Sequence, residues 1–291
     1  MIKYIAFFSI ISLLISCHGQ PAKNNYAALI KGDWIGRVDT TENNLNLTSY
    51  ISFEDSTCYG SFWSYSQYQI LQDTLYINGL FEKDKNSQYT ILRLTPDSLL
   101  LVATKHQDFI PDTVSASKIK AKNYILPSAV YFASSGCFGK CPVEYLEIDS
   151  SLHVKFYGER FTAITGGYSG TITRSQYNVI LNKIRNIPLT SLKPYYDAPW
   201  SDDQTCGIAI CNGDSVIKTA AYGHYREPME LFLVLGKLEY LFDPGVASLH
   251  ADSTVTAEYF STHSQYASIN TIVFPPKVPA PTEFTAPKIE K

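Results

Sequence analysis

Short β-like segments alternate with turn residues from about residue 26 to residue 119, with no helical period between them. The candidate strands cover residues 34–38, 49–53, 58–64, 68–71, 75–77, 89–94 and 99–103. Turn formers such as Glu42-Asn43-Asn44, Asn78-Gly79 and Pro96-Asp97 lie between them. Strands this short and this closely spaced pair with their chain neighbours. The pattern therefore predicts an antiparallel meander that closes into a small β-barrel.

The amino-acid composition agrees with a β-rich chain. It contains 21 Tyr and 15 Phe but only 2 Met, and aromatic residues are enriched in strands. The 291 residues, 45% of them hydrophobic, are enough for two packed domains. Charged residues make up 18% of the chain and the formal net charge is -3. Without a basic excess, we expect no nucleic-acid partner.

The first β region resembles lipocalin-like domains. Gly32-Asp33-Trp34 resembles their G-x-W start. Residues 89–94, followed by 97–101, resemble a sequence motif found later in the same domains. The resemblance implies a barrel that holds an apolar ligand. Small barrels are also commonly filled by their own side chains. In that case the core would include Phe53, Trp63, Tyr76, Ile91 and Leu100.

Residues from about 124 to 249 have a different pattern. Residues 128–133 are β-like, and residues 143–148 and 153–158 form a predicted hairpin, before a glycine-rich segment at 166–170. A helix follows, because Thr173 and Gln176 have the spacing of a capping box. Its apolar positions share one face and are Tyr177, Ile180, Leu181, Ile184 and Ile187. Pro188 ends it.

A second hairpin and a second helix complete this region. Residues 205–211 and 216–222 are joined by the turn Asn212-Gly213-Asp214. The second helix begins near Pro228 and ends before Asp243-Pro244-Gly245. Its core positions are Leu231, Val234, Leu235, Leu238 and Leu241. We therefore predict a mainly β chain with an α+β second domain, in which two helices pack on one antiparallel sheet.

The N-terminus carries an export signal. Lys3 precedes an apolar run at residues 4–15, which is shorter than the roughly 20 residues of a membrane-spanning helix. Leu14-Ile15-Ser16-Cys17 then resembles the lipobox of bacterial lipoproteins. The resemblance implies that residues 1–16 are a signal peptide that is removed. It also implies that Cys17 is acylated, with chains such as palmitate, and anchors the protein to a membrane.

The remaining boundaries follow from this assignment. Residues 17–25 read as a flexible tether, residues 26–119 as the β domain and residues 124–249 as the α+β domain. Residues 265–291 are proline-rich and are expected to be disordered or extended. No acidic residue directly follows Cys17. In lipoproteins this favours the outer membrane, facing the periplasm, over retention in the inner membrane.

Cysteines provide the sharpest chemical feature. Cys137 and Cys141 form a C-x3-C loop whose glycines, Gly136 and Gly139, let the backbone bend. The envelope permits disulfides, so we favour a structural bond between them. A redox-active pair is the alternative, and a metal site assisted by His153 or His224 is a further one.

The other three cysteines are not expected to pair locally. Cys206 and Cys211 are an odd number of residues apart on one strand, so they should face opposite sides of the sheet. Cys58 is expected to be a buried free thiol.

The segment around this loop resembles a bacterial domain family of unknown function. The resemblance rests on Ser135-Gly136-Cys137-Phe138-Gly139-Lys140-Cys141-Pro142 and on Gly166-Gly167-Tyr168-Ser169-Gly170-Thr171-Ile172 before the capped helix. It covers the hairpins and helices of the second domain. The family has no assigned activity, so the resemblance supplies no catalytic residue.

Other candidate residues have simpler interpretations. Ser169 lacks the final glycine of a G-x-S-x-G hydrolase turn. Asp202-Asp203 reads as a solvated turn. Tyr195-Tyr196 with Trp200 could form an aromatic patch for a sugar or a peptide, but simple packing is favoured.

We therefore expect a non-enzymatic envelope lipoprotein without cofactor or metal, used for binding or scaffolding. Its partners would be the membrane, through the lipid anchor, and an envelope protein or small molecule. The first alternative is a thiol–disulfide or redox-sensing protein that uses Cys137 and Cys141. The second is a carrier of an apolar small molecule in the barrel.

Overall fold

The structure, a computed structural model, describes residues 25–38, 47–61, 63–79, 86–105, 111–224, 226–241 and 248–262. Cys17 and the expected signal peptide, residues 17–24 of the tether, Asp243-Pro244-Gly245 and the proline-rich tail lie outside the described residues. The chain divides into two compact units, Met1–Lys118 and Ile119–Lys291. Each unit is described by itself.

The first unit is a closed antiparallel barrel in which each strand pairs with the next and β1 pairs with β8. The strands are β1 Gly32–Val38, β2 Leu47–Phe53, β3 Thr57–Gly60, β4 Trp63–Leu71, β5 Thr74–Gly79, β6 Ser87–Leu94, β7 Ser98–Ala103 and β8 Thr113–Lys118. The predicted meander and barrel are thus confirmed. Two details were wrong: residues 58–64 belong to two strands, and β8 was not predicted.

Side chains of the barrel fill its interior. Trp34 and Tyr89 are fully buried and Phe53 is 2% exposed. The Trp34 indole donates to the Ile30 carbonyl at 2.6 Å. Ile30 directly follows the short helix α1 (Tyr26–Leu29) and belongs to the same core.

The predicted core of this barrel was partly right. Phe53 and Ile91 are buried as expected, whereas Tyr76 and Leu100 are only half-buried. Their neighbours Leu75, Ile77, Leu99 and Leu101 point inward instead. Because side chains alternate along a strand, an error of one residue exchanges the two faces. The side chain of Trp63 lies outside the described ones.

Closure of the barrel depends on a close approach of β1 to β8. A Cβ at Gly36 would lie 2.0 Å from the Ser115 carbonyl oxygen and 2.8 Å from the Ala116 Cα. Both atoms belong to the backbone and cannot move aside cheaply. Only glycine fits this position of the closing strand pair.

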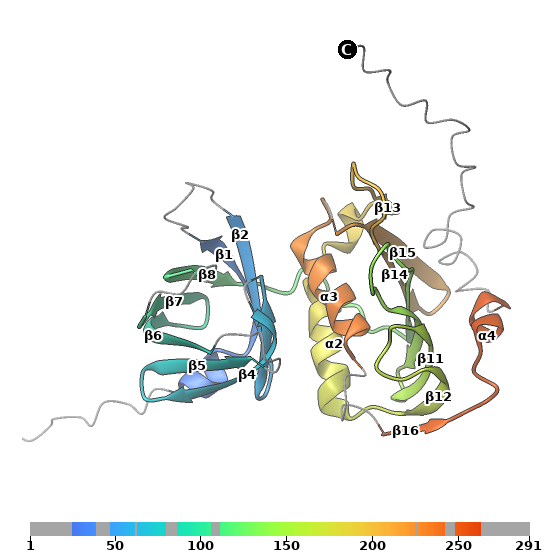
Figure 1. Ribbon diagram of the computed structural model, residues 1–291, viewed down its shortest axis with the longest axis horizontal. Helices are drawn as coiled ribbons and strands as arrows, with labels where there is room; N and C mark the ends of the chain where they lie inside the picture. The colour runs from blue at the N-terminus through green and yellow to red at the C-terminus, as the bar shows by residue number, and fades with distance from the viewer. Residues whose placement is uncertain are drawn as a thin grey trace, which may run out of the picture. The chain divides into compact units, whose positions relative to one another are not determined.

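The second unit is an eight-stranded sheet with the order β13-β15-β14-β9-β10-β11-β12-β16 (Figure 1). Its strands are β9 Ala129–Ser134, β10 Val143–Asp149, β11 His153–Arg160, β12 Gly166–Thr171, β13 Tyr195–Tyr196, β14 Thr205–Asn212, β15 Ser215–Tyr222 and β16 Ser248–Ala251. All neighbours are antiparallel except β13 and β15. Both predicted hairpins are present, and the glycine-rich segment forms strand β12.

Helices α2 (Arg174–Asn186) and α3 (Met229–Glu239) cover one face of this sheet (Figure 1). The predicted capping box is present: the Thr173 hydroxyl accepts from the Gln176 backbone N–H, and the Gln176 side chain accepts from the Thr173 N–H. The predicted apolar positions of both helices are buried in one cluster with the strands. This confirms an α+β unit.

The opposite face of the sheet carries a third layer that was not predicted. Helix α4 (Ala257–Thr262) places Phe260, which is fully buried, against Tyr145, with ring centroids 5.5 Å apart. The Tyr259 hydroxyl lies 2.6 Å from the Lys155 ammonium and 2.9 Å from a Glu147 carboxylate oxygen. Figure 1 shows α4 on the side of the sheet opposite α2 and α3.

Within the residues that the structure describes, no helix combines the length and apolarity needed to cross a bilayer.

Candidate functional site

Four loops meet at one end of the second unit's sheet, here called the disulfide end. Their described residues are 135–142, 161–165, 197–204, 223–224 and 226–228. Strand register brings them together, because Ser134 pairs with both Glu144 and Cys206, and Thr205 pairs with Tyr222. These loops therefore bring together side chains that lie far apart in the sequence.

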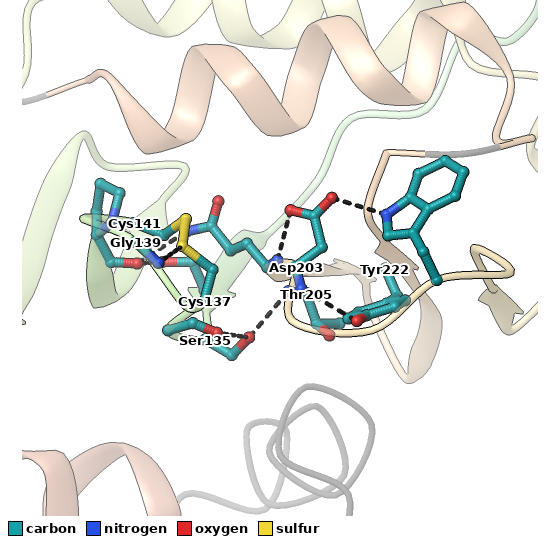
Figure 2. The surroundings of a disulfide bond; sticks show 12 residues. Ser135, Cys137, Gly139, Cys141, Asp203, Thr205 and Tyr222 are labelled. Carbon is teal, nitrogen blue, oxygen red and sulfur yellow. Dashed lines mark hydrogen bonds between the residues drawn. A yellow bond between two sulfur atoms is a disulfide. The ribbon is translucent and has the colours of Figure 1, made fainter. Parts of the chain in front are cut away.

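Cys137 and Cys141 form a disulfide, with sulfurs 2.01 Å and Cα atoms 5.6 Å apart (Figure 2). The pairing favoured from the sequence is therefore present. The bond closes a loop of five residues, so loop-closure entropy gives it about 2 kcal/mol of stabilisation, against about 3 kcal/mol for a 15-residue loop. Its contribution to global stability is small for a disulfide.

Hydrogen bonds hold both ends of the loop independently of the disulfide. Ser135 exchanges two bonds with Thr205, each 2.8 Å long: its N–H donates to the Thr205 carbonyl, and its hydroxyl accepts from the Thr205 N–H. The Pro142 carbonyl accepts from the Ser134 hydroxyl at 2.9 Å and from the Gln204 amide at 2.8 Å. The loop is thus fixed to β9 and β14.

Asp203 organises the neighbouring loop. Its carboxylate accepts from the Gln204 backbone N–H at 2.8 Å and from the Trp200 indole at 3.0 Å, and its own N–H donates to the Tyr222 hydroxyl at 3.0 Å. Figure 2 shows Asp203 between the disulfide loop and Tyr222. The expected solvated turn therefore describes Asp202, which is exposed, but not Asp203.

Exposed aromatic side chains project from these fixed loops. Phe138, at the tip of the disulfide loop, is 91% exposed, and Phe161 and Trp200 are 52% and 44% exposed. The Phe138 N–H donates to the Asp202 carbonyl at 3.0 Å, so the loop tip lies beside the Trp200 segment. We call Phe138, Phe161 and Trp200 the aromatic rim.

The aromatic patch considered from the sequence is not formed as such. Tyr196 is 6% exposed and belongs to the core that faces α2 and α3. Its hydroxyl accepts from the Lys193 N–H at 3.0 Å. Trp200 instead joins the aromatic rim.

A row of polar side chains lies beneath the disulfide end. Glu144, Ser134 and Cys206 are cross-strand neighbours on β10, β9 and β14, and all are at most 3% exposed. The Gln204 amide bonds both the Pro142 carbonyl and the Glu239 carboxylate at the end of α3. This one side chain ties the disulfide loop to α3.

The carboxylates of this row change the ionisation of their neighbours. Burial raises the pKa of Glu239, which the Gln204 bond and the charge of His224 oppose. The His224 imidazole lies 3.1 Å from one Glu227 oxygen, while the other Glu227 oxygen is buried without a hydrogen bond. Burial, and then the nearby carboxylates, raises the pKa of the Cys206 thiol well above its usual range. Cys206 is therefore an inert thiol.

The other free cysteines have equally unreactive surroundings. Burial raises the pKa of Cys58, in the barrel core, to about 12. Cys211 also has a raised pKa through burial and lies on the α4 face, whereas Cys206 lies on the face that α2 and α3 cover. The two cysteines of β14 thus point in opposite directions, as predicted.

Ser169 has a histidine partner that the sequence did not reveal. Its hydroxyl lies 3.1 Å from His250 Nε2 across the β12–β16 pair. The pKa of Asp252 is lowered by hydrogen bonds from Thr254 and from Ser169. In a catalytic triad the acid orients the histidine, whereas here Asp252 bonds the serine itself. These residues therefore bind the edge strand β16 rather than activate a nucleophile.

The histidines considered as metal ligands each lie beside a carboxylate. His153 is 3.2 Å from Asp149 on the β10–β11 hairpin, and His224 pairs with Glu227. Among the residues with described positions, no group of three or more His, Cys, Asp or Glu could hold a metal ion.

The sequence indicated the disulfide loop but not the residues around it. Gln204, His224 and Glu239 belong to a turn, a loop and a helix end that only the fold brings together. The one local signal was the polar Asp202-Asp203-Gln204 run before a buried strand.

Residues 128–242 match the model of a domain of unknown function, DUF6438. The matched range begins just before β9, ends just after α3 and contains the disulfide loop. No curated protein and no solved structure matches the chain. The match delimits a domain similar to that family and assigns it no activity.

Proposed function

We propose that this chain is a lipid-anchored lipoprotein of the bacterial envelope whose second unit is a non-catalytic binding module for another envelope protein. The lipobox-like Leu14-Ile15-Ser16-Cys17 supports the anchor, with the outer membrane as its site. The binding role rests on the aromatic rim.

The observation that carries the binding role is Phe138. A phenyl ring that is 91% exposed is unfavourable in water, and here the loop beneath it is fixed by a disulfide and by hydrogen bonds. A fixed loop loses little conformational entropy when it binds, so the aromatic side chains are ready for contact. Trp and Arg side chains contribute much of the binding energy at protein interfaces. Trp200 belongs to the aromatic rim, and the exposed Arg160 directly precedes Phe161 in the chain.

The barrel is better explained as a structural unit than as a carrier. Large side chains of the barrel occupy its described interior, including Trp34, Phe53 and Tyr89. An apolar ligand would need to displace them.

Site-specific photo-crosslinking in cells tests the binding role. A photoreactive phenylalanine analogue at position 138 of the full chain should give one discrete adduct with an envelope protein. The same analogue at Tyr124, which is 86% exposed in the same unit, is the matched control and should give none. Equal adducts at both positions, or none at position 138, would contradict the proposal.

Metabolic labelling tests the anchor separately. A palmitate analogue should label the wild-type chain and not the Cys17→Ser variant, and only the wild type should fractionate with membranes. Labelling that survives Cys17→Ser would place the lipid elsewhere.

A further inference from the structure

The disulfide differs from the other described cysteines in its accessibility. Cys137 and Cys141 are both half-buried, on a loop whose residues 138–140 are exposed. Cys58, Cys206 and Cys211 are buried free thiols. An incoming thiolate can therefore reach the Cys137–Cys141 bond without opening the fold, whereas it cannot reach the others.

The two sulfurs have different hydrogen-bonding surroundings. The Gly139 N–H donates to Cys137 Sγ at 3.2 Å. The Phe138 N–H is used on the Asp202 carbonyl, and Pro142 has no N–H to offer. Among the described contacts of the loop, Cys141 Sγ accepts no hydrogen bond. A donor at only one sulfur stabilises the thiolate form of that cysteine, which here is Cys137.

One cation, the Arg160 guanidinium, lies on the Cys137 side of the loop. A Cβ at Gly136 would lie 2.4 Å from a terminal guanidinium nitrogen of Arg160, so this cation lies against the residue before Cys137. The exposed Lys140 directly precedes Cys141, so the assignment to Cys137 rests on the Gly139 N–H and on Arg160. Two acids lie on the neighbouring loop: the Asp203 carboxylate is held by the Trp200 indole and the Gln204 N–H, and the Asp202 carboxylate accepts from the Ser201 hydroxyl.

The loop also holds its shape without the sulfur–sulfur bond. Ser135 bonds Thr205 before the first cysteine, and the Pro142 carbonyl bonds Ser134 and Gln204 after the second. Both ends therefore stay in place on reduction, and the two thiols remain close enough to form the bond again.

We propose that the Cys137–Cys141 disulfide is an exchange site for a dithiol protein, in which Cys141 is attacked and Cys137 is the leaving group. A thiolate of the partner forms a bond to Cys141 Sγ. The Cys137–Cys141 bond breaks, and its electron pair leaves on Cys137, which the Gly139 N–H stabilises. The partner's second thiolate then attacks the mixed disulfide and releases Cys141, which takes up a proton. The partner leaves as a disulfide, and this chain keeps the two electrons as the Cys137 thiolate and the Cys141 thiol.

Glutathione, a monothiol, tests which sulfur is attacked. The full chain is treated with glutathione under native conditions, quenched with acid and digested with trypsin, which cuts after Lys140 and separates the two cysteines. We expect about tenfold more glutathione on Cys141 than on Cys137. Equal labelling, or an excess on Cys137, would overturn the assignment. A bond that reacts only after a denaturant is added would overturn exchange itself.

Two substitutions of one residue test the cause. A Cβ at Gly139 would lie 3.6 Å from Cys137 Sγ, an ordinary contact, so Gly139→Ala keeps the loop and its N–H. Gly139→Pro removes the N–H. In the reduced chain, the pH dependence of alkylation should give Cys137 a pKa about one unit below that of Cys141 in the wild type and in Gly139→Ala. The difference should disappear in Gly139→Pro. An unchanged difference there would exclude the Gly139 N–H as its source.

These outcomes are independent of the binding role. Crosslinking at position 138 reports a docked protein whether or not the disulfide reacts, and the glutathione result reports the disulfide without any partner. The exchange proposal goes beyond the binding module by naming the chemistry of the partner, a protein with two reactive thiols.

Discussion

The two units cover the edges and faces of their β-sheets in different ways. The barrel joins its first strand to its last and has no edge, whereas the second unit is an open sheet covered by α2 and α3 on one face and α4 on the other. Apart from Asp33, the buried polar residues described in the barrel are serines. The second unit instead buries Glu144, Lys183 and Lys237.

This difference supports the proposed division of the chain into a structural barrel and a second unit with a binding role. A closed, filled barrel satisfies its backbone internally and offers little that is reactive. The open sheet ends in loops that combine a disulfide with exposed aromatic side chains, above the buried Glu144 of β10. Scaffolds of this kind commonly carry function on loops that a rigid sheet positions.

The largest expected effect comes from truncating the barrel core. Trp34→Ala should destabilise the first unit by about 3–5 kcal/mol, because it removes a fully buried indole. Leu235→Ala, at a fully buried position of α3, is the counterpart in the second unit. Urea unfolding followed by circular dichroism and limited proteolysis should show each substitution shifting only its own unit's transition. A common shift would mean that the two units unfold together.

The second largest effect on stability concerns the polar side chains beneath the disulfide end of the second unit. Gln204→Ala should cost about 2–3 kcal/mol, because it leaves the half-buried Glu239 carboxylate without its amide donor. Gln67→Ala, at an exposed barrel position, should change stability by less than about 0.5 kcal/mol. Chemical denaturation of both variants measures this contrast. A similar loss of stability in the two glutamine variants would show that Gln204 does not stabilise the Glu239 carboxylate.

Loss of the disulfide should have a smaller effect. Replacing both Cys137 and Cys141 by serine should cost about 2 kcal/mol or less, because the closed loop is short and hydrogen-bonded at both ends. Its reduction potential, measured by mass spectrometry in graded thiol buffers, should lie between about -120 and -270 mV if the bond exchanges. A value below about -300 mV would mark a purely structural bond.

The smallest effect is a pH dependence at Glu239. Its folded pKa is raised above the ordinary value of 4.5, mainly by burial, so the folded state holds this proton more tightly than the unfolded state. The related stability is present below about pH 4.5 and is lost as pH rises through the folded pKa. The melting temperature of Glu239→Gln should therefore rise relative to that of the wild type as the pH increases. Parallel melting curves from pH 4 to 8 would contradict this.

Sequence patterns predicted the features that local chemistry determines. The capping box of Thr173 and Gln176 and the turn at Asn212-Gly213-Asp214 need only neighbouring residues, and both lie where expected. The C-x3-C loop is equally local. Barrel closure was predicted from strand spacing, although β8 was missed because its polar residues, Thr113-Val114-Ser115-Ala116-Ser117-Lys118, show little apolar content.

Long-range contacts explain the features that were missed. From the sequence, β12 was only a glycine-rich segment and was not predicted as a strand. A Cβ at Gly167 would lie 1.8 Å from the Val255 carbonyl oxygen, and one at Gly170 would lie 2.0 Å from that of Ser248. These glycines let β16 and the segment before α4 approach the sheet. Nothing near them in sequence reveals those partners, just as nothing near Gln204 reveals Glu239.

If the chain is exported as proposed, the β1–β8 pair also sets an order of folding events. The barrel closes once Lys118 is available to pair with Trp34, and none of its strands comes from later residues. In the second unit, β9 needs β14, and the sheet is complete only when β16 arrives. A chain that crosses a membrane N-terminus first therefore finishes its barrel while its second half is still in transit. Only the second unit then exposes unpaired strands to aggregation and to chaperones.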